Sequence, residues 1–249
     1  MDKKKKNNII KYLKLLGLSS IKNIIEEAEE DTAAEKGDAH DYLLQLLQHE
    51  HECRRERRIT RLRKQSKLTL DKTFESFDKD RLSVKIKRQL KVILEGSFLD
   101  RSENILIFGN PGSGKTHLAS AISHALIEDE HKMIATQCPL LIQELLREKK
   151  EYRLEKILKK YSRFEGVFID DIGYTQQTRE EMEVFFNFLA TRYESGSVII
   201  TSNLPFSKWN KIFKDSMTAA AAVDRLVHHS IIIELNLPSY RLESAKRRK

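Results

Sequence analysis

The fold of this chain is decided by the stretch Gly109-Asn110-Pro111-Gly112-Ser113-Gly114-Lys115-Thr116. The apolar run 105–108 comes before it and the helix-like run 117–123 comes after it, so the chain reads strand, loop, helix. That setting and the spacing of the glycines and the lysine match the phosphate-binding loop pattern. A glycine turn followed by a chance Lys-Thr pair is the alternative, and the flanking strand and helix argue against it. The sequence therefore predicts a site for the phosphates of a nucleoside triphosphate.

Each residue type in this loop has a chemical task. Glycines allow backbone N–H groups to turn toward the phosphates, and the following helix points its positive dipole end at them. We expect Lys115 to reach the β and γ phosphates and the Thr116 hydroxyl to ligate Mg²⁺. The nucleotide-binding residues that we predict are Gly109, Asn110, Pro111, Gly112, Ser113, Gly114, Lys115, Thr116 and His117.

Two carboxylates end a second apolar run further along the chain. Residues 166–169 are typical of a buried parallel strand, and Asp170 and Asp171 follow directly. We expect Asp170 to hold Mg²⁺ together with Thr116, and Asp171 to act as the base or water-orienting group for attack on the γ phosphate. Solvated acids at a strand end are the alternative. The phosphate loop earlier in the chain favours the catalytic interpretation.

Length and composition set outer limits on the protein. The 249 residues, 40% of them hydrophobic, suffice for one α/β domain and a smaller appendage. Cys53 and Cys138 lie far apart without metal-ligand spacing, which is typical of reduced thiols in a cytoplasmic protein. The N-terminal apolar stretch is interrupted by Lys11 and Lys14, so we expect neither export nor a membrane span. The net charge of +8 favours a polyanionic partner, nucleic acid ahead of an acidic membrane surface.

The chain divides into three predicted parts. Apolar residues recur at helical spacing through 9–63, which indicates a small helical domain over residues 1–70 with a break at Gly37-Asp38. Residues 71–103 form a linker region with an amphipathic helix over 84–94. We expect residues 104–249 to form the domain that carries the phosphate loop and acts as an ATPase.

The strongest basic cluster lies at the end of the helical domain. Between residues 54 and 67, Glu56 is the single acid. We predict that this cluster contacts the phosphates of double-stranded DNA, and a solvated, charged helix face remains the alternative. The DNA-binding residues that we predict are Arg54, Arg55, Arg57, Arg58, Arg61, Arg63 and Lys64.

Strand-like runs alternate with helical segments in the last part of the chain. They predict a three-layer α/β/α domain with a five-stranded parallel sheet and a ligand site at the carboxyl ends of the strands. The strand before Asp170 is third in sequence, which leaves room for another strand between it and the loop strand. The predicted strands cover residues 105–108, 133–136, 167–169, 198–201 and 231–233.

Two later residues complete the expected site. Asn203 follows the fourth strand, where its amide could hydrogen-bond the γ phosphate and the attacking water. It resembles the sensor-1 residue of AAA+ ATPases, and a plain strand-to-turn asparagine is the alternative. Arg225 precedes the last strand and resembles the arginine finger by which AAA+ subunits complete a neighbour's site. A surface Asp-Arg pair is the alternative there.

Taken together, the motifs resemble the IstB/DnaC group of AAA+ proteins, and within it the IstB family of helper ATPases that insertion sequences encode. The resemblance implies ATP and Mg²⁺ as cofactors, largely sequence-nonspecific DNA binding, ATP-dependent homo-oligomers on DNA, and assistance to a partner transposase in target-site selection and insertion. The matching stretches are 12–18, 52–63, 108–117, 170–174, 192–194, 201–209 and 219–229.

The chain departs from that family at one position. The family usually has Asp-Glu where this chain has Asp170-Asp171, which shortens the reach toward the catalytic water by one methylene. Tyr240-Arg241 is the candidate for a sensor-2 element.

Two other functions share parts of this pattern. A DnaC-like loader would grip a replicative helicase with the N-terminal part, and a small-molecule kinase would need an arginine-rich lid and an acceptor pocket, which the sequence does not offer.

Overall fold

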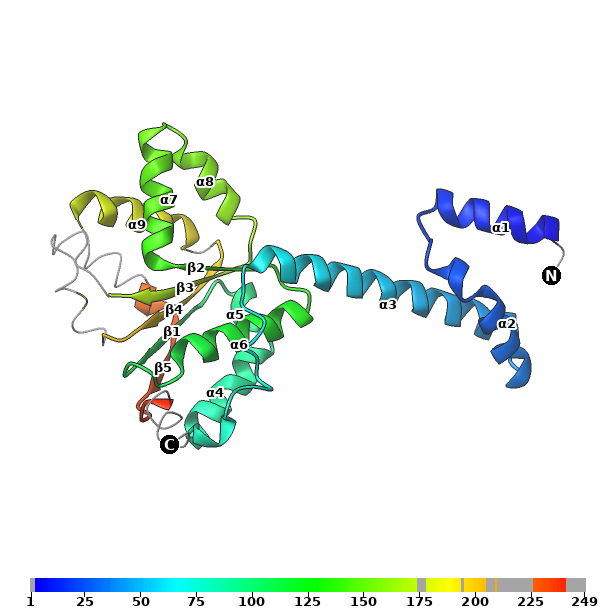
Figure 1. The fold of residues 1–249 in the computed structure, drawn as a ribbon, viewed down its shortest axis with the longest axis horizontal. Helices are drawn as coiled ribbons and strands as arrows, with labels where there is room; N and C mark the ends of the chain where they lie inside the picture. The colour runs from blue at the N-terminus through cyan, green and yellow to red at the C-terminus, as the bar shows by residue number, and fades with distance from the viewer. Residues whose placement is uncertain (1–2, 174–177, 194, 205–208, 210–225, 241–249) are drawn as a thin grey trace, which may run out of the picture. The chain divides into compact units, whose positions relative to one another are not determined.

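The computed structural model describes residues 3–173, 178–193, 195–204, 209 and 226–240 (Figure 1). The chain forms two compact units, residues 1–61 and 62–249. Their boundary falls inside helix α3 (Ala39–Ser66). The domain limits at residues 70 and 103 stay predictions.

The N-terminal unit is helical, as its apolar spacing predicts. Helix α1 (Lys3–Leu15), the 3-10 turn η1 (Ile21–Asn23), α2 (Ile25–Ala34) and most of α3 build it. Its buried core consists of Ile21, Ile25, Ala28 and Leu46. The expected break between helices is confirmed, because the Asp38 carboxylate accepts hydrogen bonds from the backbone N–H groups of His40 at 2.7 Å and Asp41 at 3.1 Å.

The second unit contains the predicted five-stranded sheet. The strands are β1 (Asn104–Gly109), β2 (Met133–Gln137), β3 (Gly166–Ile172), β4 (Ser197–Ser202) and β5 (Ser230–Leu235). All neighbouring pairs are parallel, and the order is β2-β3-β4-β1-β5. Strand β4 therefore lies between the Asp170 strand and the loop strand, where the sequence leaves room for another strand.

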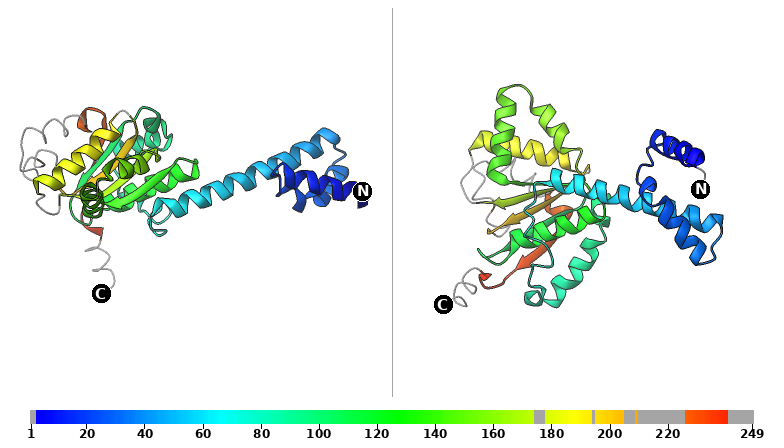
Figure 2. Two further views of the ribbon diagram at one scale, coloured as in Figure 1. Left: turned by 90° about the horizontal axis from the view of Figure 1, so that it is seen from above. Right: turned by 45° about the vertical axis from the view of Figure 1, so that its right-hand side comes forward.

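Helices cover both faces of the sheet (Figures 1 and 2). On one face, three helices pack over Leu106, Ile169 and Ile200 in one buried cluster: α7 (Cys138–Lys150), α8 (Leu154–Tyr161) and α9 (Arg179–Arg192). On the other face lie α6 (Lys115–Glu128) and α4 (Val84–Leu94), with α6 in contact with β1, β3 and β4. Burial on both faces explains why the strand sequences are continuously apolar. Two short helical elements, η2 (Lys79–Arg81) and α5 (Ser97–Asp100), flank α4 in the chain.

This topology brings four of the predicted catalytic residues, Lys115, Asp170, Asp171 and Asn203, to one edge of the sheet. Because the strands are parallel, the carboxyl ends of β1, β3 and β4 lie side by side, and the phosphate loop joins the end of β1 to α6. In the described parts of the chain, no helix combines the length and the apolar character that crossing a bilayer requires.

Candidate functional site

The phosphate loop has the backbone conformation that its glycines predict. Gly112 and Gly114 lie at φ +78° and +100°, where residues with a side chain are strained. Gly114 is the N-cap of α6, and a Cβ there would lie 3.3 Å from the Phe77 ring. The first turn of α6 therefore follows directly on a tight backbone loop, an arrangement suited to binding anions.

Two side chains of the loop fit a polyanionic ligand. Lys115 is only 7% exposed, and its ammonium group donates to the Asn110 carbonyl at 2.9 Å. The buried Ser113 hydroxyl has no hydrogen-bond partner among the described residues. The Lys115 ammonium, which folds back toward its own loop, and the Ser113 hydroxyl can both donate hydrogen bonds to phosphate oxygens.

A hydrogen-bond network joins the loop to the two central strands. The Thr116 hydroxyl donates to Asp170 Oδ1 at 2.9 Å, and the Thr201 hydroxyl donates to the same oxygen at 2.5 Å. Thr116 opens α6, Asp170 lies near the end of β3, and Thr201 lies near the end of β4. The structure thus brings together Thr116 and Asp170, the predicted magnesium ligands. Thr201 was not among the predicted site residues, although its hydroxyl at the end of a buried strand was a signal.

Asp171 occupies an irregular position in β3. The pairing of β3 with β4 shifts between Ile169 and Ile172, and Asp171 lies there at φ +66°. Its backbone N–H donates to the Thr201 hydroxyl at 2.9 Å, and its side chain is exposed. Burial, together with the negative charge of Asp171, raises the pKa of the Cys138 thiol to about 12.

Asn203 follows β4 at the same edge of the sheet. Its Oδ1 atom is buried and has no hydrogen-bond partner within the described residues. A buried acceptor without a partner carries a desolvation cost, which a donor such as a bound water would remove. Asn203 is therefore placed and equipped to orient a water molecule, and its catalytic role stays a prediction.

The loop lines a cleft of about 850 Å³, including its open mouth. Phe77, Arg81 and Tyr240 also line this cleft. The Arg81 guanidinium lies 5.4 Å from the centroid of the Tyr240 ring, and the Tyr240 N–H donates to the Gly112 carbonyl at 2.9 Å. The chain after β5 therefore folds back onto the loop. The cleft has the size and mixed polarity of a site for a nucleotide-sized ligand. In the sequence, Phe77 is only a member of the linker region, without a predicted role.

His117 belongs to the same cleft and also fastens the linker region. Its Nε2 atom lies 2.9 Å from the Thr73 carbonyl, and its ring meets the Phe77 ring edge-on at 5.1 Å between centroids. Its direct contact with nucleotide, which the loop pattern implies, stays a prediction.

Several predicted DNA-binding arginines also bond within the protein. Arg54 bonds the buried Glu50 carboxylate at 2.8 Å and donates to the Gly17 carbonyl at 3.0 Å, and Arg57 bonds the Ser20 hydroxyl. Arg63 bonds Glu128 at 2.7 Å. The remaining members of the predicted cluster are likewise exposed, namely Arg55, Arg58, Arg61 and Lys64.

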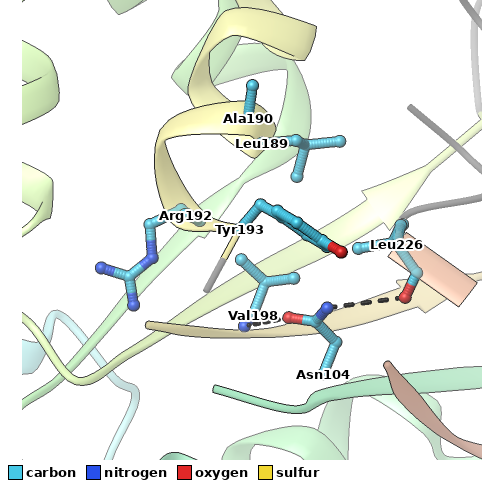
Figure 3. Close-up of a pocket in the computed structure, with 7 residues that line it drawn as sticks. All are labelled: Asn104, Leu189, Ala190, Arg192, Tyr193, Val198 and Leu226. Atoms are coloured by element: carbon cyan, nitrogen blue, oxygen red, sulfur yellow. Dashed lines mark hydrogen bonds between the residues drawn. The ribbon is translucent and has the colours of Figure 1, made fainter. Parts of the chain in front are cut away.

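A second, smaller pocket lies at the opposite ends of the strands (Figure 3). There the Asn104 side chain accepts a hydrogen bond from Val198 N–H at 2.9 Å and donates to the Leu226 carbonyl at 3.5 Å. Arg192 also lines this pocket and is 3% exposed. Its guanidinium donates to four backbone carbonyls, and burial lowers its pKa to about 10. Arg192 therefore ties loops together in the fold. Arg225, the predicted finger, and Arg241 lie outside the described residues.

Comparison with known proteins identifies the family. A family model described as IstB-like ATP binding protein matches residues 11–248. A protein of Sinorhizobium fredii, named as an insertion sequence ATP-binding protein, is 39% identical over 235 residues, which cover 94% of this chain and 79% of the relative.

Solved structures support the fold alone, because their identity is low. The DnaC helicase loader superposes with a TM-score of 0.55 at 19% identity, covering 66% of this chain and 97% of the loader. AMPPCP-bound DnaA from Aquifex aeolicus gives 0.56 at 20% identity, covering 74% of this chain and 56% of DnaA. The predicted α/β fold with a five-stranded parallel sheet is thereby confirmed. The predicted ATPase activity is confirmed by the match to a family of ATP-binding proteins. With its family model matched over nearly its whole length and its phosphate loop in place, the chain belongs to the IstB-like ATP-binding proteins of insertion sequences.

Proposed function

We propose that this ATPase assembles on DNA in an ATP-dependent manner and helps the transposase of its insertion sequence to select a target site. The proposal is supported by the hydrogen bond from Thr116 to Asp170, which joins the phosphate loop to the acidic strand in one ATP site. It is also supported by relatives that are named as insertion sequence ATP-binding proteins. The alternative is a DnaC-like helicase loader, and with either function the protein would act in the cytoplasm. The likeness to DnaC extends to the fold, which does not choose between the two.

Nucleotide binding would use the whole cleft. The loop backbone and Lys115 would hold the phosphates, and the base would lie beside Phe77, Arg81 and Tyr240, where aromatic and guanidinium planes can stack on it. Thr116 and Asp170 fit Mg²⁺ because both present oxygen atoms, 2.9 Å apart, next to the loop. The metal would neutralise charge on the β and γ phosphates.

Hydrolysis would depend on groups at the ends of β3 and β4. Asp171 would accept a proton from the attacking water or orient it, and the Asn203 amide would hold the same water or the γ phosphate. Asp171 is one methylene shorter than the glutamate usual in the family. Because the shorter side chain alters the reach toward the water and not the phosphate loop, we expect a changed hydrolysis rate and unchanged nucleotide binding.

Assembly on DNA is supported by charge and by the expected finger. The chain carries a net charge of +8, and Arg61 and Lys64 are exposed at the end of α3. Arg225 of a neighbouring subunit would complete the ATP site, so that bound ATP stabilises the oligomer and hydrolysis loosens it.

Electron microscopy of the protein with double-stranded DNA, with and without ATP, tests the assembly. We expect ordered oligomers on DNA that need ATP. Assemblies that form equally well without nucleotide would contradict the proposal. Co-fractionation of the full-length protein with the transposase of the same insertion sequence tests the partner, and retention of a replicative helicase in its place would favour the loader.

Mixing two inactive variants tests the finger. Arg225→Ala should bind ATP nearly normally, yet hydrolyse it about a thousandfold more slowly or worse. Mixed with Asp171→Asn, it should regain part of the ATPase rate, because some interfaces then combine an intact pocket with an intact finger. With subunit exchange verified by labelled protein, a mixture as inactive as its components would show that Arg225 does not act in trans.

A further inference from the structure

Thr201 occupies a buried position between the two candidate catalytic acids. It lies near the end of β4 and is 1% exposed. Val198 and Ile200 of the same strand face the cluster under α7 and α9, so alternation turns Thr201 toward the α6 face. That face carries Thr116 and the phosphate loop. A threonine so buried at this edge directs its hydroxyl into the candidate active site.

The Thr201 hydroxyl makes two hydrogen bonds of opposite sense. It donates its proton to Asp170 Oδ1 at 2.5 Å and accepts the Asp171 backbone N–H at 2.9 Å. A hydroxyl can do both at once, whereas a methyl group can do neither. One side chain on β4 thus contacts both consecutive acids of β3.

The bond to Asp171 also has a backbone consequence. Between Ile169 and Ile172, β3 gains a residue relative to β4, and an extra residue of this kind loses its ladder partner. The Thr201 hydroxyl accepts the N–H of Asp171, which lies at φ +66°. The bond therefore supports the backbone turn that sets where the Asp171 carboxylate points.

We propose that Thr201 is a positioning residue for ATP hydrolysis, whose hydroxyl holds the Asp170 carboxylate for Mg²⁺ and fixes the backbone of Asp171. The inference rests on the proposed roles of these two acids. Thr201 itself touches neither the reacting atoms nor the metal, because its hydroxyl is occupied by the acids. The consequence is that removing the hydroxyl should damage turnover and metal dependence more than it damages nucleotide binding.

The test compares Thr201→Val with Thr201→Ser in the full-length protein. Valine keeps the shape and loses both hydrogen bonds, whereas serine keeps the hydroxyl. Thr201→Val should lower kcat by about tenfold to hundredfold, the scale of a misplacement of catalytic groups by roughly an ångström. It should change the affinity for a fluorescent ATP analogue in the absence of Mg²⁺ by less than about threefold. The Mg²⁺ concentration that half-saturates analogue binding should rise several-fold. Thr201→Ser should restore both values.

Two controls separate this role from a loss of folding and from failure of the proposed site. Ser197→Ala removes another buried hydroxyl from the far end of β4, where it bonds the Phe98 carbonyl, and it should leave kcat and Mg²⁺ dependence unchanged. Asp170→Ala tests the site itself. If Asp170→Ala is inactive while Thr201→Val keeps the parent kcat and Mg²⁺ dependence, the inference on Thr201 is wrong and the site stands. If Asp170→Ala hydrolyses ATP normally, the site assignment and the inference both fail. If Thr201→Val does not fold, Thr201→Ala takes its place as the variant without the hydroxyl. A Thr201→Ser protein whose kcat or Mg²⁺ dependence is as impaired as that of Thr201→Ala would then overturn the inference.

Discussion

Thr116 Oγ1 lies 2.9 Å from Asp170 Oδ1, although the two residues are 54 positions apart in the chain. The contact joins the first turn of α6 to the end of β3, across the edge where the parallel strands end. The phosphate loop and the Asp170 strand therefore form one site, because a displacement of either element would alter this hydrogen bond.

Replacing Lys115 by alanine should weaken ATP binding. Lys115 is the loop's positive charge, and a hydrogen bond to a charged group is worth about 1.5–3 kcal/mol, or roughly a tenfold to hundredfold change in Kd. Titration with a fluorescent ATP analogue measures the loss. Lys91→Ala, at an exposed lysine in the last turn of α4, is the control and should bind like the parent. Equal affinities of Lys115→Ala and Lys91→Ala for the ATP analogue would show that Lys115 does not contribute to ATP binding.

Asp171→Asn should bind ATP and hydrolyse it about a hundredfold to ten-thousandfold more slowly, the range for loss of a general base. Asparagine tolerates the left-handed backbone of residue 171 nearly as well as aspartate, so the irregular end of β3 should persist. Single-turnover hydrolysis and analogue binding measure the two effects separately. Hydrolysis at the parent rate would show that another group orients the water.

Asp171→Glu restores the side chain usual in the family and tests reach against backbone strain. Glutamate adds a methylene but is less tolerant of φ +66° than aspartate. We expect a variant with no more than a modest gain in kcat and a lower melting temperature than the parent. A large gain in kcat with unchanged stability would mean that the shorter side chain of Asp171 alone limits kcat in this protein.

DNA affinity should depend on salt through Arg61 and Lys64. Replacing both by alanine should flatten the slope of log Kobs against log salt by up to roughly 0.9 for each phosphate of duplex DNA that is no longer neutralised. The matched control exchanges them as Arg61→Lys and Lys64→Arg, which keeps both charges and should keep the slope. These positions are preferable to Arg54, whose bonds to Glu50 and Gly17 hold the helical unit together. An unchanged slope would move the DNA site elsewhere, with Lys159 and Lys160 next to be tested.

Acid should loosen the helical unit through Glu50. Burial favours the neutral form of this carboxyl, but bonds from Arg54 and the Ser20 N–H outweigh it and hold the pKa of Glu50 below its ordinary value of 4.5. A carboxyl whose pKa is lowered by folding stabilises the fold above its unfolded pKa, and this stability is lost as the pH falls through the folded pKa. Protection of the Ser20 amide from hydrogen exchange should therefore decline below about pH 4.5.

A glutamine at position 50 separates this effect from general acid denaturation. Glu50→Gln should weaken Ser20 protection at neutral pH and remove much of its decline in acid. Glu56→Gln, at an exposed acid of α3, should behave like the parent. The same acid decline in Glu50→Gln as in the parent would assign it to other carboxyls.

The amino-acid sequence was enough to predict the helices, the strands and the position of the candidate site. Glycine spacing, the apolar strand runs and the Gly37-Asp38 break are local signals, because backbone conformation and strand or helix periodicity depend on neighbouring residues. They predicted the loop, the five strands, the helical N-terminal part and a site that combines the phosphate loop with Asp170.

Other contacts between distant segments are visible only in the tertiary structure. The order β2-β3-β4-β1-β5 brings Thr201 beside Asp170, and the chain after β5 folds back to set Tyr240 beside Gly112. It also showed that Arg54 bonds a buried glutamate and that Arg192 serves loop carbonyls. The sequence alone does not distinguish an arginine that contacts a phosphate from one that contacts a carboxylate or a carbonyl. Its partner is chosen by packing between segments far apart in the chain, which local patterns do not encode.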